Sequence, residues 1–263
     1  MEKTNLFVTF KSSISDVAAI VKRNLMRVRR SPQILVFSSI QPIMFLVLFN
    51  YVFGGAIGVA TPGSSYINFL LPGIMAQSAL FGALQTPVAL VEDLDKGAID
   101  RFRSLPMSRG AVLAGRTIAD GLRTTFTITL MFVVGTIMGF RYQAGTGKFI
   151  AALALVVAFS FAFSWVTATL GLFIRNAEAV QTAGFLFVFP LTFASSAFVP
   201  VATMPGWLQA FARNQPVTQL INAMRALLLG GVAIDAVYIT MAWIVVTLII
   251  FIPLAVWKFG KTA

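Results

Sequence analysis

Residues 149–173 read FIAALALVVAFSFAFSWVTATLGLF, a stretch that contains no charged side chain. A helix needs about 20 mainly apolar residues to cross the roughly 30 Å hydrocarbon core of a bilayer, whereas buried helices of soluble proteins are usually interrupted earlier by polar residues. The length and composition of this stretch therefore predict a membrane-spanning helix.

Five further apolar stretches have a similar length. They cover residues 34–55, 66–91, 124–140 with an extension towards its start over 117–123, about 182–202, and about 236–257. The whole chain is 58% hydrophobic and 11% charged, with a mean hydropathy of +0.86, outside the range of soluble domains. We predict an all-α, polytopic membrane protein with six transmembrane helices in a single domain, residues 1–263.

The distribution of Lys and Arg predicts how these helices are oriented. Fifteen of these residues fall before the first stretch, between the second and third, between the fourth and fifth, and after the last, whereas four fall in the other connections. Cytosolic loops carry the excess of Lys and Arg, so both termini are expected in the cytosol. The net charge of +11 is thus explained by contact with membrane lipid, and no nucleic-acid partner is expected.

The residue types that are missing exclude several kinds of chemistry. The chain has no Cys and no His, so disulfides, thiolate nucleophiles, Cys/His zinc sites and imidazole proton relays are excluded. A nucleotide-binding GxxxxGK[ST] loop is approached at AGTGKF, but Tyr142 replaces the first Gly and Phe149 replaces the Ser or Thr. We expect no enzyme activity and no cofactor or metal bound by this chain.

Residues 1–33 precede the first apolar stretch and are expected to contain an amphipathic helix. One face is apolar and the basic residues lie largely elsewhere, so the helix should lie flat on the inner leaflet. Its apolar stripe consists of Val17, Ile20, Val21, Leu25 and Val28. Two interpretations remain open: a basic membrane anchor, or a helix that also braces the cytosolic side of the protein. No small-residue cleavage pattern follows, so a removable signal peptide is not expected.

The connection at 92–117 begins EDLDKGAIDRFRSLPMSRG, the longest charged passage of the chain. Residues 95–104 can form a short helix that Leu105-Pro106 terminates. The segment is too short to be a domain, and its apolar members Ala98, Ile99 and Phe102 are few and grouped. It is interpreted either as a contact element for a partner or as a solvated loop.

Three passages together resemble one family, the ABC type-2 permeases, and within it the daunorubicin-resistance (DrrB-like) group. They are EDLDKGAIDRFRSLPMSRGAVLAGR at 92–116, FIRNAEAVQTAGFLFVFPLTFASSAFVPVATMPGWLQ at 173–209 and NQPVTQLINAMRALLLGG at 214–231. The last departs from the family pattern, because Gln215 separates the Asn from the Pro. The passages occur in the family's order and span most of the chain.

The resemblance implies a permease that lacks its own motor. Two six-helix units, identical or paralogous, would form the pathway in a bacterial cytoplasmic membrane, and two copies of a separate ABC ATPase would bind ATP and Mg below them. The loop after the second helix would be the coupling helix, and 203–235 would form re-entrant or interfacial helices outside. Candidate coupling residues are Glu92, Asp95, Lys96, Asp100, Arg101, Phe102, Arg103, Pro106 and Arg109, with Arg175 and Glu178 in the second cytosolic loop and Trp207 and Arg225 in the outer segment.

The expected cargo is hydrophobic or amphipathic, such as a drug-like compound, a lipid or a glycolipid. The chain has 25 Phe but four Tyr and four Trp, and Phe offers an apolar ring face without a hydrogen-bonding edge. The alternatives are a polysaccharide or teichoic-acid exporter and, in another class, an ion-coupled secondary transporter. A secondary transporter usually needs ionisable groups at mid-membrane, and the apolar cores of the six stretches contain no Asp, Glu, Lys, Arg or His.

Two polar or kinked features within the helices have alternative interpretations. Asp120 and Arg123, three residues apart, indicate an ion pair near the membrane surface or a gate. Pro42, Pro72 and Pro190 break helical hydrogen bonds and indicate either kinks that line a pathway or sites of packing.

The predicted orientation can be tested by cysteine labelling, because the chain contains no native Cys. For Ser104→Cys we expect no reaction with a membrane-impermeant maleimide in intact cells and full reaction after the membrane is permeabilised. A cysteine at Lys148, on the predicted outer side, is the matched control and should react in intact cells. Labelling of Ser104→Cys from outside would reverse the orientation.

Overall fold

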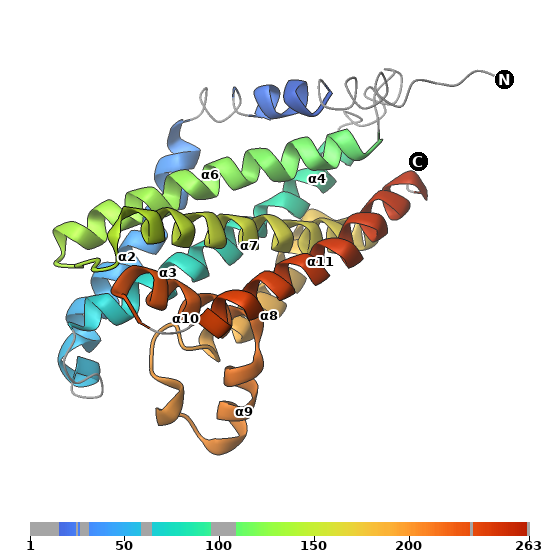
Figure 1. Cartoon of the computed structure of the whole chain (residues 1–263). Helices are drawn as coiled ribbons and strands as arrows, with labels where there is room; N and C mark the ends of the chain where they lie inside the picture. Colours follow the sequence, from blue (N-terminus) through green and yellow to red (C-terminus); the bar gives the residue numbers. More distant parts are fainter. Residues whose placement is uncertain are drawn as a thin grey trace.

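The computed structural model describes residues 16–24, 26, 32–58, 65–95, 109–231 and 234–261, and these ranges are helices joined by turns, without a strand (Figure 1). The all-α prediction is therefore confirmed. The elements are α2 (Pro32–Gly58), α3 (Tyr66–Ala83), α4 (Gln85–Asp95), α6 (Arg109–Ile137), α7 (Gly145–Ile174), α8 (Ala177–Phe193), the 3-10 helix η1 (Val201–Thr203), α9 (Gly206–Asn214), α10 (Pro216–Leu229) and α11 (Ile234–Lys261).

Five helical stretches of the described chain are long and apolar enough to cross a membrane. They are Ser38–Gly55, Tyr66–Leu94, Leu113–Ile137, Gly145–Ile174 and Ile234–Lys261. The expected fifth helix differs from the prediction: α8 begins before residue 182 and ends at Phe193 rather than near 202, with 17 residues. Asn176 starts α8 by accepting a hydrogen bond from the Ala179 amide through its side chain (2.8 Å).

The side chain of Gln215 caps the C-terminal end of α8. Its amide nitrogen donates to the carbonyls of Leu191 (2.8 Å) and Ala194 (3.0 Å), which the end of the helix leaves without backbone partners. Gln215 is also the residue immediately before α10. The residue that departs from the family pattern therefore joins the end of α8 to the start of α10.

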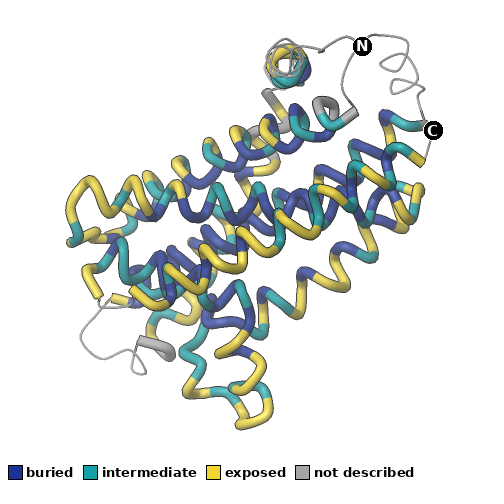
Figure 2. The backbone as a smooth tube through the Cα atoms, turned by 45° about the vertical axis from the view of Figure 1, so that its right-hand side comes forward, coloured by how far each residue is buried: buried dark blue, intermediate teal, exposed yellow. Residues whose placement is uncertain are grey.

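α7 occupies the middle of the bundle and packs against α3, α4, α6, α10 and α11. Small hydroxyl side chains on α7 reach the backbone of α3: Ser160 donates to the Ala79 carbonyl (3.0 Å) and Thr167 to the Ala83 carbonyl (2.8 Å). Small polar residues are typical of helix contacts within membranes, where backbones approach closely and no water competes. In Figure 2 the buried residues accordingly concentrate along the inner sides of the helices.

The predicted second helix, 66–91, is two helices rather than one. α3 ends at Ala83 and α4 begins at Gln85, with Leu84 between them in a turn. Pro87 lacks the N–H that would bond to the carbonyl of Ala83, and Thr167 supplies a donor to that carbonyl instead. Pro72 has the same effect further along α3, since it removes the N–H that would bond to the carbonyl of Asn68.

Residues at the two ends of the bundle establish the path of the chain. One end of the bundle, which we call the terminal end, contains an apolar cluster that includes Leu90, Leu113, Leu172 and Phe259. At the opposite, distal end, the Tyr66 hydroxyl donates to the Phe198 carbonyl (3.0 Å) and the Gln143 amide donates to the Leu228 carbonyl (3.0 Å). The helical segment 16–24 and the last turns of α11 both lie towards the terminal end, whereas α9 protrudes away from them (Figure 1).

The segment between α8 and α11 returns into the bundle through α10. The sequence of this segment predicts an apolar stripe of Leu220, Ile221, Met224, Leu227 and Leu228. Four of these residues are buried in α10, and Leu227 is half-buried. By contrast, α9 is largely exposed, with Ala212 as its buried residue. α10 therefore contributes to the core at the distal end, and α9 with η1 forms the exposed part of this segment.

The N-terminal segment 16–24 contacts α6 and α4, as the bracing interpretation requires. Ile20 is 4% exposed and packs against Gly115, where a Cβ atom would lie 2.7 Å from two atoms of Ile20. Val17 and Val21 are half-buried while Lys22 is exposed, which matches the predicted amphipathic pattern. Leu25 and Val28 of the predicted stripe lie outside the residues whose side chains are described.

The close approach of α3 to the turn after α8 yields a test of the fold. A Cβ at Gly73 would lie 2.7 Å from the Ala197 Cα and 2.9 Å from its carbonyl carbon, both backbone atoms that cannot rotate away. Overpacking of this kind typically costs about 1–3 kcal/mol, more than the roughly 1 kcal/mol that Ala gains over Gly in a helix. We expect Gly73→Ala to lower the melting temperature of the detergent-solubilised protein by several degrees.

Gly121→Ala is the matched control, because a Cβ there would meet nothing within 4 Å. It should leave the melting temperature unchanged or raise it. Equal melting temperatures for the two variants would contradict the packing of α3 on the turn after α8.

Candidate functional site

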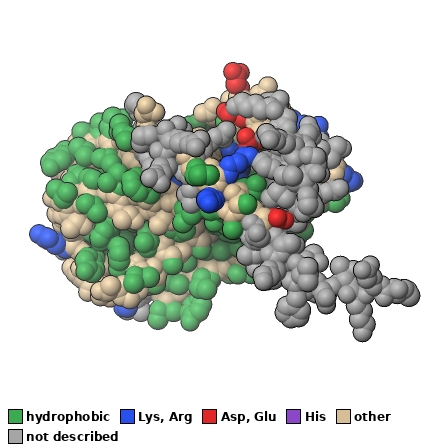
Figure 3. All heavy atoms as spheres, turned by 90° about the horizontal axis from the view of Figure 1, so that it is seen from above, with side chains coloured by type: hydrophobic (Ala, Val, Ile, Leu, Met, Phe, Trp, Pro, Cys, Tyr) green, Lys and Arg blue, Asp and Glu red, His purple; other side chains and the backbone are tan. Residues whose placement is uncertain are grey.

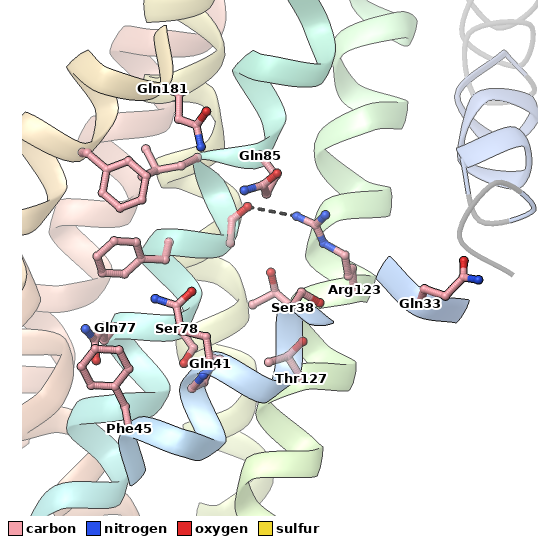
Figure 4. A pocket seen from close by; sticks show the side chains of 16 residues that line it. Gln33, Ser38, Gln41, Phe45, Gln77, Ser78, Gln85, Arg123, Thr127 and Gln181 are labelled. Atoms are coloured by element: carbon pink, nitrogen blue, oxygen red, sulfur yellow. Dashed lines mark hydrogen bonds between the residues drawn. The ribbon is translucent and has the colours of Figure 1, made fainter. Parts of the chain in front are cut away.

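A cavity of about 480 Å³ lies between α2, α3, α4, α6 and α8. Its lining combines side-chain amides and hydroxyls with aromatic rings, as the close view in Figure 4 shows. The α2 and α8 residues that line it are largely exposed, whereas those from α3 are largely buried. The cavity is therefore closed on its α3 side and open between α2 and α8.

Five glutamine side chains from four helices contribute to the lining. They are Gln33 and Gln41 of α2, Gln77 of α3, Gln85 of α4 and Gln181 of α8. None of the five side chains makes a hydrogen bond to another residue within the described ranges. Gln77 is the most significant, because it is only 7% exposed.

Gln77 is thus a largely buried residue whose amide lines the cavity and has no described protein partner. A polar group buried without a hydrogen bond costs free energy, particularly in an apolar surrounding such as a membrane. A ligand or water in the cavity would provide that partner. The sequence contained a signal for this residue, since Gln41 and Gln77 are amides inside apolar stretches predicted to cross the membrane, but these residues were not selected.

Aromatic side chains form the apolar part of the lining. Phe45 comes from α2, Phe81 from α3 and Phe185 from α8, and the rings of Phe81 and Phe185 lie 5.5 Å apart between centroids. Pro42 of α2 also lines the cavity. Pro72 and Pro190, the other two expected kink residues, lie within α3 and α8 and do not line the cavity. The lining thus offers apolar faces next to amide donors and acceptors.

Arg123 is the charged residue in this lining. Its guanidinium lies 3.6 Å from the Asp120 carboxylate and donates to the Gly82 carbonyl (3.1 Å, dashed in Figure 4). Asp120 in turn accepts a hydrogen bond from the Thr86 hydroxyl (2.7 Å). The expected ion pair between Asp120 and Arg123 is confirmed, and it ties α6 to the junction of α3 and α4.

A second ion-pair cluster holds the two helices that flank the charged loop. Asp93 of α4, 6% exposed, pairs with Arg116 of α6 (2.5 Å) and with Arg23 of the N-terminal segment (3.3 Å). In the view of Figure 3, acidic and basic side chains gather on one part of the face while hydrophobic side chains cover much of the rest. The sequence predicts a coupling role for its neighbours Glu92 and Asp95, and a role for Asp93 was not predicted.

The predicted coupling residues fall at the edges of the described chain or outside it. Glu92 is exposed on α4, Asp95 is its last residue, and Arg109 is the first residue of α6; the side chains of Asp95 and Arg109 are not described. The remaining candidates, Lys96, Asp100, Arg101, Phe102, Arg103 and Pro106, lie outside the described residues.

The other selected residues occupy two separate places. Arg175 and Glu178 are both exposed at the terminal end, where Arg175 ends α7 in a left-handed conformation (φ 52°) and Glu178 lies in the first turn of α8. Trp207 is 76% exposed on α9, and Arg225 lies on α10 with its guanidinium bonded to α3. None of these four residues lines the cavity between α2 and α8.

Comparisons with known proteins identify the family. The ABC-2 type transporter family matches residues 15–229. The chain is 33% identical to the daunorubicin resistance ABC transporter permease protein DrrB1 of Streptomyces coeruleorubidus, over 83% of this chain and 77% of the relative. It is 29% identical to the probable doxorubicin resistance permease protein DrrC of Mycobacterium tuberculosis, over 82% and 78%, and 26% identical to the putative transport permease ycf38 of Cyanophora paradoxa, over 81% and 74%.

The match covers most of the chain, and it agrees with a bundle of membrane-spanning helices around a cavity. This protein belongs to the ABC-2 type transporter family and is a permease related to those of daunorubicin and doxorubicin resistance.

Proposed function

We propose that this permease exports hydrophobic or amphipathic compounds of drug size, and that they bind in the cavity between α2, α3, α4, α6 and α8. The observation that carries this proposal is Gln77, a largely buried residue of the cavity wall whose amide has no described protein partner. Pockets for drug-sized ligands combine mainly apolar walls with a few polar groups that orient the ligand. Phe45, Phe81 and Phe185 supply such walls here.

The size of the cavity favours a small cargo over a polymer. Its volume of about 480 Å³ is within the 300–1,000 Å³ typical of sites for drug-sized molecules. A polysaccharide would need an extended groove that binds several sugar units in succession. The glutamines give the cavity hydrogen-bonding edges that the Phe content of the sequence did not indicate, and these would orient the polar groups of an amphipathic compound.

ATP hydrolysis is assigned to a separate ABC ATPase, which would bind ATP and Mg. The ion-pair cluster supports this assignment, because Asp93 and Arg116 hold α4 and α6 together where the loop leaves one helix and enters the other. A loop anchored at both ends transmits a displacement to the helices that carry it. α4 contributes Gln85 to the cavity and α6 contributes Arg123, so the same two helices connect loop and cavity.

A second permease copy would complete the cavity on its open side. α2 and α8 carry exposed apolar residues next to the opening, including Met44 and Val47 on α2 and Phe185 and Phe189 on α8. The ion-coupled alternative has less support, since Arg123 is the charged residue among those lining the cavity and it is paired with Asp120.

The cargo assignment is tested with daunorubicin, the drug after which one related resistance permease is named. In cells that produce this permease with its ATPase, Gln77→Leu should export daunorubicin with an apparent affinity about 3–10-fold lower, since one hydrogen bond contributes about 0.5–1.5 kcal/mol. Cellular fluorescence over a range of drug concentrations measures the change.

Gln143→Leu is the control, because Gln143 is exposed at the distal end and away from the cavity. It should export daunorubicin like the wild type. Wild-type export by Gln77→Leu would show that the cavity is not the binding site, and a wild-type complex that does not lower daunorubicin accumulation would contradict the cargo class.

The coupling assignment is tested by reversing charges in the loop. Asp100→Lys and Arg101→Glu should each reduce export and co-purification of the ATPase, because like charges then meet in a contact where water is limited. Membrane insertion should be unchanged. Lys148→Glu reverses an exposed charge at the other end of the bundle and should have no effect. Full export and full ATPase retention by both loop variants would favour the solvated-loop interpretation.

A further inference from the structure

A second cavity, of about 490 Å³, lies at the distal end between the first turn of α3, the turn after α8, η1 and α10. Two arginines line it, Arg225 from α10 and Arg213 from α9. Its other polar lining residues are Ser196, Thr218, Gln219 and Asn222. The described side chains that line this cavity are therefore cationic or neutral, and none of them is a carboxylate.

The groups that hold Arg225 in place within the described residues are all neutral. Its Nε and Nη2 donate to the Phe69 carbonyl (3.1 and 2.8 Å), Nη2 also donates to the Ser196 carbonyl (2.6 Å), and Nη1 donates to the Ser196 hydroxyl (3.2 Å). The guanidinium also lies 3.6 Å from the centroid of the Phe69 ring. Carbonyls and an aromatic face orient and stabilise a cation, but they do not neutralise its charge.

One N–H of Arg225 remains available. A guanidinium has five N–H donors, and the four bonds to Phe69 and Ser196 leave one Nη1 hydrogen without an acceptor in the described part of the chain. The guanidinium is thus fixed in position and retains both a charge and a donor for a ligand.

Two neighbouring side chains present further donors. The Thr218 oxygen accepts from the Ser196 amide (3.3 Å), and its own hydroxyl hydrogen has no acceptor among the described residues although Thr218 is 2% exposed. Asn222 accepts from the Ser196 hydroxyl through Oδ1 (3.3 Å), which leaves its NH₂ group without a partner in the same ranges. A buried hydroxyl and a side-chain amide therefore supplement the two arginines.

We propose that this cavity binds a phosphate group, carried by a lipid headgroup of the outer leaflet or free in solution. A phosphate has several acceptor oxygens and a negative charge, and it would satisfy the remaining donors of Thr218, Asn222 and Arg225 together. Among the described residues, the Arg213 side chain bonds to Gln209 (2.9 Å), which leaves other guanidinium donors for the same ligand. Occupancy would neutralise Arg225 and bridge α9 to α10.

The apolar residues of the lining suit an amphipathic ligand. Pro200, Val201 and Ala202 lie on one side of the cavity and Phe69 lies beneath the guanidinium. These residues have no role towards free phosphate, whereas the glycerol and acyl segments of a lipid would contact them. The site is separate from the cavity near Gln77, with which it shares no lining residue, so it does not depend on the identity of the cargo.

The experiment measures thermal stability of the purified, detergent-solubilised full chain with added dioctanoyl phosphatidylglycerol or inorganic phosphate. A ligand that binds the folded state raises the melting temperature by mass action, and a rise of about 3–5 °C is expected near saturation. Dioctanoylglycerol, which lacks phosphate, should give no comparable rise. The lipid alone raising the melting temperature would identify a headgroup, and inorganic phosphate alone would identify the free ion.

Asn222→Asp is the decisive variant, because it changes one amide to a carboxylate of the same shape next to Arg225. It should raise the melting temperature without ligand, since the carboxylate neutralises the guanidinium, and weaken the phosphate-dependent shift at least 10-fold. Asn176→Asp makes the same substitution at the other end of the bundle, where Asp also caps a helix, and should keep the wild-type response.

Three results would overturn the proposal. One is a wild-type protein that neither phosphatidylglycerol nor phosphate stabilises. Another is a shift with dioctanoylglycerol as large as that with phosphatidylglycerol. The third is an Asn222→Asp variant that retains the full phosphate-dependent shift.

Discussion

Backbone carbonyls of α3 accept hydrogen bonds from side chains of three other helices, and the arrangement of the bundle depends on these bonds. Arg225 of α10 donates to Phe69, Ser160 and Thr167 of α7 donate to Ala79 and Ala83, and Arg123 of α6 donates to Gly82. A carbonyl that its own helix leaves open must find another donor where water is scarce. Pro87 creates such a position at Ala83, where α3 meets α4.

These bonds also determine where the cavities lie. The junction of α3 and α4 places Gln77, Phe81 and Gln85 along one wall of the cavity that opens between α2 and α8. At the distal end, the same helix presents the Phe69 carbonyl and ring to Arg225, which shapes the second cavity. One helix, α3, therefore contributes to both binding regions, while α7 packs against it.

At the terminal end, ion pairs and an apolar contact hold the elements together. There Asp93 is shared by two arginines, one on α6 and one on the N-terminal segment, and Ile20 packs into the space left by Gly115. Removing one partner of a buried ion pair leaves an uncompensated charge, so α4, α6 and segment 16–24 depend on one another. These are the elements next to the charged loop, which lies outside the described residues.

The sequence alone determined the class of the protein, because the length of an uncharged apolar stretch is a local property that needs no knowledge of packing. It also determined the family through ordered motifs, the apolar stripe of α10, and the ion pair of Asp120 with Arg123, whose spacing brings them to one helix face. Residues such as Gln77, Asp93 and Gln215 acquired their roles only in the tertiary structure.

The physical reason is that each of these three roles depends on partners far along the chain. Gln77 is significant because residues of four other helices surround it without bonding to it, Asp93 because Arg23 and Arg116 converge on it, and Gln215 because α8 ends beside it. The break between α3 and α4 was likewise not visible in the sequence, because both helices lie in one continuous apolar stretch. Hydropathy does not reveal that Thr167 on α7 will donate to the Ala83 carbonyl. Periodicity and composition report what a segment is made of, whereas packing decides which polar groups are left for a ligand.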